Sequence, residues 1–146
     1  MLSTLKEIFE RDLNKVKKEI DLYEKEELIW LVRSEVNNSA GNLVLHLCGN
    51  LKHFIGAILG NTGFKRDREA EFSAKNVSRE SLHKQIDETH KVVLETLDNM
   101  NELELEATYP INVLREDMST EFFLTHLATH LSYHLGQLTY HRRLIS

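Results

Sequence analysis

The segment that decides the fold runs from Glu121 to His141 and reads Glu-Phe-Phe-Leu-Thr-His-Leu-Ala-Thr-His-Leu-Ser-Tyr-His-Leu-Gly-Gln-Leu-Thr-Tyr-His. Between Glu121 and Arg142 it contains no Asp, Glu, Lys or Arg. At about 100° per residue, its Leu residues and Phe123 fall on one arc of a helix, which we expect to run from about Thr120 to Leu144. A helix without charge has to be covered on most of its sides.

The opposite side of this predicted helix carries only small polar residues. Thr125, Ser132 and Thr139 recur there at intervals of seven, where the outer helix of a monomer normally shows charge. We interpret this side as a contact surface for a partner. The partner that we expect is a second copy of the chain, in a homodimer.

The spacing of apolar residues predicts three further helices. The stretch from about Ser39 to Leu59 has Lys52 as its only formal charge, so this helix should also be buried, and Ser39 offers a capping side chain. The stretches from about Ser3 to Tyr23 and from about Ser78 to Met100 are amphipathic, because apolar residues recur at three- and four-residue steps among charges.

The composition favours an all-α fold with a single core. Six Gly and one Pro in 146 residues are too few for the tight turns that many short strands need. This length suits one domain of ordinary size, so we expect residues 1–146 to form a single domain. Longer connections are predicted at about 61–77, which is rich in charge of both signs, and at about 101–118, which holds the only proline.

Charge and cysteine usage narrow the expected partners and compartment. The 18 basic and 23 acidic side chains give a formal net charge of -5, which argues against nucleic acid as a partner. The only cysteine, Cys48, cannot close an intramolecular disulfide and is assigned to packing. The first residues offer no signal-peptide apolar region, and no apolar run approaches the ~20 residues of a membrane span. We therefore expect a cytoplasmic protein that contacts no membrane.

The histidines are the main candidates for chemistry. His126, His130 and His134 recur every four residues on the predicted C-terminal helix, and His141 follows seven residues later, so that they form a stripe. His126 and His134 are separated by about 12 Å of helix rise, too far to share one ion. A pair from this stripe with a third ligand from another helix fits better, and His46 is the best external candidate.

Two interpretations without a metal fit the same residues. His46 alone could be a core histidine satisfied by a hydrogen bond, and the stripe alone could be a seam of neutral imidazoles. We favour coordination, because three imidazoles with no carboxylate in either helix body suit a divalent transition metal. Three protein ligands leave a position open for water or substrate, as in catalytic sites. Nickel, zinc, copper and iron all suit such ligands.

Other side chains are expected to border this site. Asn50 and Gln137 each lie one turn beyond a proposed ligand, where they could fix an imidazole tautomer or make ordinary interhelical hydrogen bonds. Tyr133 and Tyr140 could present hydroxyls to a pocket, although packing or a dimer contact is the simpler expectation. We expect the remaining histidines to be near neighbours of the site (His53, His126 and His141) or surface residues (His83 and His90).

Three segments together resemble the DinB-like (YfiT-like) superfamily. They are Asn38–Leu51 with its Leu-His-Leu-Cys-Gly-Asn-Leu sequence, Arg66–Phe72, and His130–Leu138 with its His-Leu-Ser-Tyr-His-Leu-Gly-Gln sequence. The match covers nearly the whole chain in the right order. The resemblance implies a four-helix bundle with up-down-down-up connection, often dimeric. It also implies a divalent metal, nickel or zinc among others, held by residues that match His46, His130 and His134.

The resemblance also implies an activity. Some members of the superfamily are thiol-dependent enzymes, namely S-transferases that use bacillithiol or mycothiol and a maleylpyruvate isomerase. We therefore expect a metal-dependent enzyme acting on a small-molecule substrate, such as an S-transferase that uses a low-molecular-weight thiol of the bacillithiol type. The metal would lower the pKa of that thiol. Arg66 or Arg68 could bind an anionic group of the substrate, unless the 61–77 connection is only a salt-bridged crossover.

Three alternatives stay open at this point. A metal-dependent hydrolase, as other members are described, would use the same ion to activate water, with Glu69 or Glu71 as the base. A non-catalytic helical dimer would hold the ion as a structural or sensor ligand. In the third alternative no metal binds, and the histidines only pack.

Overall fold

The computed structural model describes residues 1–145, and their regular elements are helices. Within this range no strand forms, and Thr108 and Ser119 make one isolated antiparallel bridge. The expected all-α class is confirmed. In chain order the elements are α1 (Leu2–Asp21), η1 (Glu26–Trp30), α2 (Ala40–Leu51), η2 (Lys52–Ala57), α3 (Arg68–Ser73), α4 (Arg79–Asp98), α5 (Glu102–Glu106) and α6 (Thr120–Ile145).

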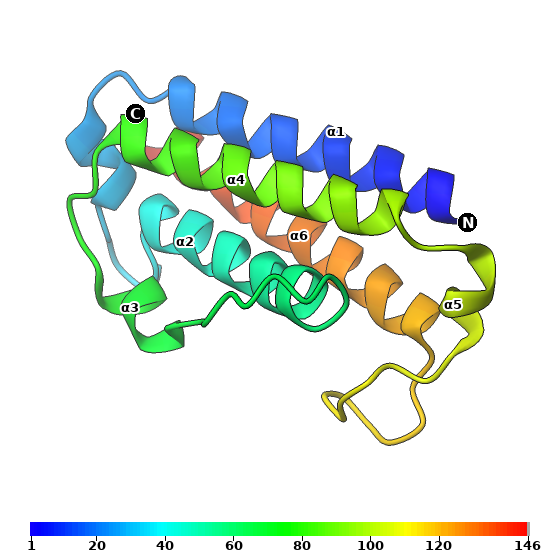
Figure 1. Ribbon diagram of the computed structural model, residues 1–146. Coiled ribbons are helices and arrows are strands. Elements are labelled where there is room, and N and C mark those ends of the chain that lie inside the picture. The colour runs from blue at the N-terminus through cyan, green and yellow to red at the C-terminus, as the bar shows by residue number, and fades with distance from the viewer. Residues whose placement is uncertain (146) are drawn as a thin grey trace.

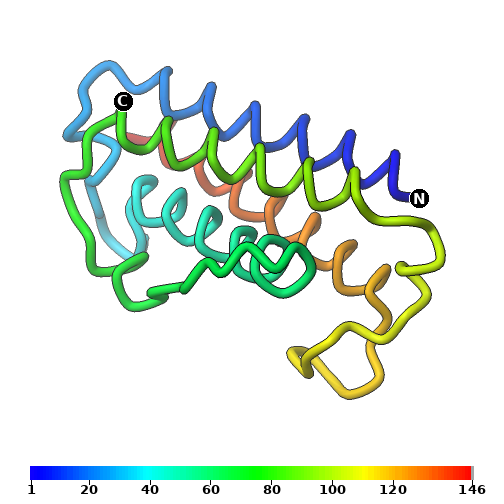
Figure 2. Tube along the Cα trace, viewed as in Figure 1, coloured from blue at the N-terminus to red at the C-terminus, as the bar shows by residue number. Residues whose placement is uncertain are grey.

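Four long helices form the bundle (Figure 1). α1 and α6 run in one direction, and α2 and α4 run in the other. α1 packs against α4 and α6, and α2 packs against the same two helices. The connection is therefore up-down-down-up, as expected. Because α2 and α4 are parallel, the chain has to return along the bundle between them, and Figure 2 traces this crossover through α3.

Local signals in the sequence explain where the helices begin. The Ser39 hydroxyl accepts a hydrogen bond from the backbone N–H of Asn42, and the Ser78 hydroxyl does the same for Ser81, so each serine caps its helix. The apolar stripe of α1 lies in the core, with Phe9 and Ile20 fully buried. Each of the four predicted helices is present, although the second ends differently from the prediction.

The second helix changes its winding at Leu51. The prediction of one α-helix to Leu59 is wrong there, because residues Lys52–Ala57 form a π-helix with a bond from the Ile58 N–H to the His53 carbonyl. The wider turn rotates the following residues relative to α2. The prediction that α2 would be covered is confirmed, since all twelve of its residues are buried.

α6 is covered on only part of its surface by its own chain. Phe123, Leu127, Leu131 and Leu138 are buried, as expected of the apolar arc. The opposite face is exposed, and the expectation of a helix surrounded on most sides does not hold within one chain. The exposed residues of this face are Phe122, Thr125, Thr129, Ser132, Tyr133, Gly136, Tyr140, Arg143 and Leu144.

Three short helical elements were not predicted. η1 packs against α2 through Trp30, whose ring would lie 2.6 Å from a Cβ placed on Gly41. α3 covers another part of α2, and α5 packs on α6. None of the described helices combines the length and the apolar character that a membrane span requires.

Candidate metal centre

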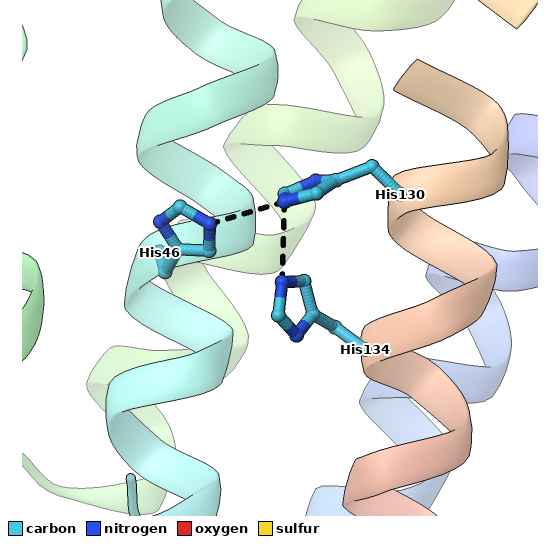
Figure 3. Close-up of side chains that lie close together, drawn as sticks. All are labelled: His46, His130 and His134. Carbon is cyan, nitrogen blue, oxygen red and sulfur yellow. Dashed lines mark hydrogen bonds between the residues drawn. The ribbon is translucent and has the colours of Figure 1, made fainter. Parts of the chain in front are cut away.

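Three histidines converge in the space between α2 and α6. Figure 3 shows His46 on α2 pointing toward His130 and His134 on α6. The Nε2 atom of His130 lies 3.2 Å from Nε2 of His46 and 3.1 Å from Nε2 of His134. One ligand nitrogen from each ring lies within 4.8 Å of the other two. The three residues selected from the sequence are therefore brought together.

The Nδ1 atoms on the outer side of two rings have acceptors. Nδ1 of His46 lies 3.0 Å from Oε1 of Glu71, and Nδ1 of His134 lies 2.7 Å from Oε1 of Gln137. Each Nδ1–H donates to its oxygen, so each Nε2 directs a lone pair into the space between the helices. The predicted role of Gln137 in fixing an imidazole tautomer is supported by this contact.

Burial favours the neutral form of His46 and His130. Burial lowers the pKa of His46, although the neighbouring Glu71 carboxylate opposes the shift. Burial, reinforced by His134, His46, His126 and Arg66, lowers the pKa of His130 to about 4. A neutral imidazole with a free Nε2 lone pair is the form that binds a metal ion.

The residues present fit a divalent transition metal. Nitrogen ligands held ~2.0–2.1 Å from one zinc ion at tetrahedral angles lie about 3.3–3.4 Å apart, close to the 3.1 and 3.2 Å measured here. Facing lone pairs repel one another unless a cation or a proton lies between them. Nδ1 of His130 is also buried without a hydrogen-bond partner among the described residues. Within that part of the chain three potential ligands gather, so a bound ion would keep a coordination position open.

Glu71 reaches His46 because α3 is anchored on α2. The Asn42 side chain donates hydrogen bonds to the Glu71 and Ala74 carbonyls at 2.9 and 2.8 Å. Asp67 caps the first turn of α3 by accepting from the Ala70 N–H at 3.1 Å. The Glu71 side chain then lies so close to α2 that a Cβ on Gly49 would be 1.9 Å from its Oε2. Gly49 is therefore required for this contact.

Arg66 holds the Glu71 carboxylate in place. Its Nε and Nη2 atoms lie 2.8 and 2.9 Å from the two Glu71 oxygens, and both side chains are nearly buried. A bidentate pair of this kind fixes the orientation of the carboxylate. Because Glu71 is engaged by Arg66 and His46, it supports a ligand and is not free to act as the base considered from the sequence.

A cavity of about 280 Å³ opens beside the histidines. Phe54, Phe123, Leu127 and Val113 supply apolar walls, and no Asp or Glu lines it among residues 1–145. The polar groups that line this cavity are His46, His130, His126, Asn50, Arg66 and Arg68.

Comparisons with known proteins place the chain in a family. The sequence model of a protein of unknown function (DUF1572) matches residues 1–146, the whole chain. The chain belongs to the DUF1572 family. Searches among curated proteins and among solved structures each found no match.

The other predicted residues of this DUF1572 member lie either near the three converging histidines or away from them. Arg68 and Asn50 line the cavity, as expected for pocket residues. Tyr133 packs its ring 5.2 Å from that of His134 and is 64% exposed. Arg66 is paired with Glu71, so it is not free for a substrate anion. Cys48 is buried, and burial raises its pKa to about 11, which agrees with its assignment to packing.

Two expectations for the remaining histidines are corrected. His141 is not near the centre, because its Nδ1 lies 2.6 Å from the Tyr23 hydroxyl and its Nε2 donates to the Leu31 carbonyl at 2.8 Å. His53 makes an edge-to-face contact with Phe54 and is not one of the three histidines that gather. It is a neighbour of the group that supports His46, because burial and then the charge of Arg66 lower its pKa. His83 and His90 are half-buried rather than fully exposed, and each faces an acidic residue of α1. His126 lines the cavity as a neighbour.

The sequence reasoning missed the support that Glu71 gives to His46. The sequence suggests Glu71 as a base, and Arg66 as an anion-binding residue or as part of a salt-bridged crossover, but it does not link either residue to His46. A signal was present, because Arg66 and Glu71 lie five residues apart in a segment that matches the resemblance, and an isolated buried histidine needs a partner. Which partner it finds depends on how α3 docks.

Proposed function

We propose that this protein is a DinB-like, divalent-metal-dependent enzyme that uses a low-molecular-weight thiol, in the manner of a bacillithiol-type S-transferase. The observation that carries the proposal is the convergence of the Nε2 atoms of His46, His130 and His134 beside an accessible cavity. The DinB-like resemblance of the surrounding segments supports the same assignment. Nickel and zinc are the ions that we expect.

Three protein ligands favour a catalytic ion over a structural one. Structural zinc sites usually have four protein ligands, whereas catalytic sites keep one position for water or substrate. Among the described residues only three ligands gather, and the cavity lies at His46 and His130. When bound, the ion would lower the pKa of a thiol in the cavity and make it a nucleophile near neutral pH.

The residues around the cavity would position the ligands, accept the thiol proton and exclude water. Glu71 and Gln137 hold two imidazoles with their Nε2 atoms inward. His126 lies where it can accept the thiol proton. Phe54 and Phe123 limit the access of water to the reacting sulfur. In the transfer the S–H bond breaks, a bond forms between the sulfur and a carbon of an electrophilic substrate, and the leaving group departs with its electron pair.

The cavity lining favours this reaction over the hydrolase alternative. A metal-dependent hydrolase needs a general base to take a proton from water, and the carboxylates considered for that role are Glu69 and Glu71. Glu71 is held by Arg66, and no Asp or Glu lines the cavity within residues 1–145. A thiol needs less help, because its ordinary pKa of ~8.5 is already close to neutral pH.

The proposal is tested by metal analysis and a conjugation assay. The purified protein, loaded with zinc or nickel, is mixed with small thiols and an electrophile such as monochlorobimane. We expect conjugation by the parent and its loss, together with the metal, in a His130→Ala/His134→Ala variant. A parent that binds no metal would refute the site. A parent that binds metal but conjugates no thiol would favour the hydrolase, and a large loss of melting temperature in chelator would favour a structural ion.

We also propose that the exposed face of α6 pairs with the same face of a second copy. This face lacks charge between Glu121 and Arg142 and includes Tyr133, 64% exposed, and Tyr140, 66% exposed. An antiparallel arrangement centred on the middle of the helix places the acidic start of one α6, at Glu121, near the basic end of the other, at Arg143. The same alignment sets Tyr140 beside Thr125 of the second copy, and Gly136 beside Thr129 of the second copy. Each facing pair therefore includes at least one small residue.

A further inference from the structure

The proposed function leaves one buried polar group of the cavity without a role. Oδ1 of Asn50 is buried and has no hydrogen-bond partner among residues 1–145, and Asn50 as a whole is only 7% exposed. Burying an amide oxygen without a partner costs free energy, so such atoms usually have an unobserved ligand or water. Asn50 lies one turn beyond His46 on α2 and lines the same cavity. A donor group of a bound molecule would satisfy it.

The cavity also contains one cation that is free to bind an anion. Arg66 and Arg68 both line it, but the donors of Arg66 are engaged by Glu71. Arg68 has no carboxylate within ion-pair distance in the described part of the chain, and its guanidinium lies 6.0 Å from the centre of the Phe72 ring. An exposed guanidinium at the edge of a cavity is suited to bind a carboxylate.

The size of the cavity limits what can occupy it. A volume of about 280 Å³ is at the lower end of ligand pockets, and it corresponds to about nine water molecules at ~30 Å³ each. A small molecule of about ten non-hydrogen atoms therefore fits beside the histidines. The aromatic walls of Phe54 and Phe123 suit the apolar part of such a molecule.

We infer that the cavity selects a small thiol that carries both a carboxylate and an N–H group. Its carboxylate binds Arg68, its N–H donates to Oδ1 of Asn50, and its sulfur faces the three Nε2 atoms. The inference rests on the proposed function, since it places the thiol at the metal position. It goes further by assigning Asn50 and Arg68 as the residues that determine which thiol is accepted.

Three thiols distinguish the carboxylate contact with Arg68 from the N–H contact with Asn50. N-acetyl-L-cysteine has the thiol, the carboxylate and an amide N–H, N-acetylcysteamine lacks the carboxylate, and 3-mercaptopropionate lacks the N–H. Each is titrated into the cobalt(II)-loaded protein, and the absorption of the sulfur–cobalt interaction gives its Kd. We expect N-acetyl-L-cysteine to bind about tenfold more tightly than either analogue, the factor that ~1.4 kcal/mol produces.

Two variants then assign each preference to a residue. Arg68→Gln should remove the preference over N-acetylcysteamine and leave the preference over 3-mercaptopropionate unchanged. Asn50→Leu should have the opposite effect, and it should not lower the melting temperature, because it removes an unpaired buried amide. Lys65→Gln removes a charge from the same connection outside the cavity and should retain both preferences.

The outcomes distinguish this inference from the proposed function. If the parent binds all three thiols equally, or if neither variant changes its preference, the roles of Asn50 and Arg68 are refuted while thiol binding at the metal stands. If no thiol gives a sulfur–cobalt absorption in the parent, the proposed function fails and the inference fails with it. Because Arg68 is exposed, its variant remains informative even if Asn50→Leu does not fold.

Discussion

The Nδ1 atom of His46 donates to Oε1 of Glu71 across 3.0 Å, although the two residues are 25 positions apart in the chain. The same carboxylate is bound by Arg66, which shares Oε1 with His46. The carboxylate thus sets the tautomer of a proposed ligand, and the arginine sets the orientation of the carboxylate. The connection between α2 and α4 therefore supports the proposed metal centre without contributing a ligand to it.

Replacing Glu71 with Ala should weaken zinc binding about 10- to 100-fold, the usual effect of removing the partner of a ligating histidine. Glu71→Gln keeps an oxygen that can accept a hydrogen bond from His46, so its zinc affinity should lie between those of Glu71→Ala and the parent. The measurement is competition with a coloured chelator at pH 7.5, with folding checked by circular dichroism. Glu69→Ala, at an exposed position of α3, is the control and should bind as the parent does. Parent-like affinity of Glu71→Ala would contradict the role of the carboxylate.

Gly49→Ala should also weaken zinc binding, although Gly49 touches no metal ligand. Its new Cβ would be 1.9 Å from Oε2 of Glu71, so the carboxylate has to move away from α2 and its contact with His46 is lost or lengthened. Gly136→Ala is the matched control, since a Cβ there meets nothing within 4 Å. That control should bind zinc normally and raise stability by up to about 1 kcal/mol through helix propensity. Equal zinc affinity in both variants would show that Glu71 tolerates displacement.

Gln137→Leu should weaken zinc binding less than Glu71→Ala does. The amide oxygen of Gln137 lies 2.7 Å from Nδ1 of His134, but Gln137 is exposed, so water can replace it as the acceptor. We expect a loss of about tenfold or less in the same competition assay. Gln137→Glu keeps the acceptor and adds a negative charge, so its affinity should equal or exceed that of the parent. A stronger effect of Gln137→Leu than of Glu71→Ala would reverse the order of importance proposed here.

The metal-free protein should lose stability as the pH falls below about 6.5. The folded-state pKa values of His46, His130 and His141 are lowered mainly by burial, that of His130 to about 4. The unfolded chain therefore binds more protons below pH 6.5, and the stability present above that pH is lost as it decreases. In excess chelator we expect a melting temperature at least about 4 °C lower at pH 5 than at pH 7.5.

The contribution of the centre to this pH dependence can be isolated. A His130→Leu variant removes the histidine whose pKa burial lowers to about 4, and it should show a smaller decrease in melting temperature between the two pH values. An equal or higher melting temperature of the parent at pH 5 would contradict the assignment of these histidines as neutral in the folded protein.

Ser132→Arg should convert the proposed dimer to a monomer. Ser132 is exposed at the centre of the uncharged face of α6, where two-fold pairing would bring the two arginines together without a partner for their charge. Sedimentation equilibrium should give twice the chain mass for the parent and the chain mass for the variant. Ser3→Arg, at an exposed position of α1, makes the same substitution elsewhere and should remain dimeric. A monomeric parent would refute the pairing.

The convergence of the three histidines could be predicted from the sequence because helical period and missing charge together place them on facing sides of two buried helices. His130 and His134 are one turn apart, and the absence of charge from their helix and from α2 required both helices to be buried. Buried helices with facing histidines have few arrangements in a four-helix bundle. The first residues of the helices capped by Ser39 and Ser78 could also be predicted from the local sequence, since a cap depends on a side chain and the three residues that follow it.

What surrounds the ligands was decided by contacts between distant segments. His141 continues the stripe of histidines, yet Tyr23 and the Leu31 carbonyl bind both of its nitrogens at the other end of α6. The helix changes from α to π winding after Leu51, over a segment that includes His53. A regular helical projection cannot anticipate either result, because one depends on the docking of η1 and the other on a local change in winding.

The sequence by itself determined the helical class, the His130–His134 pair and the buried character of α2, since each follows from periodicity and charge within one helix, and it identified His46 as the partner from the second helix without charge. The tertiary structure alone decided that Glu71 rather than water supports His46, that Arg66 is engaged while Arg68 is free, and that Asn50 faces a cavity with an unpaired oxygen. These contacts depend on the path of the crossover, where side-chain direction follows from packing against α2 and from no repeating pattern in the chain.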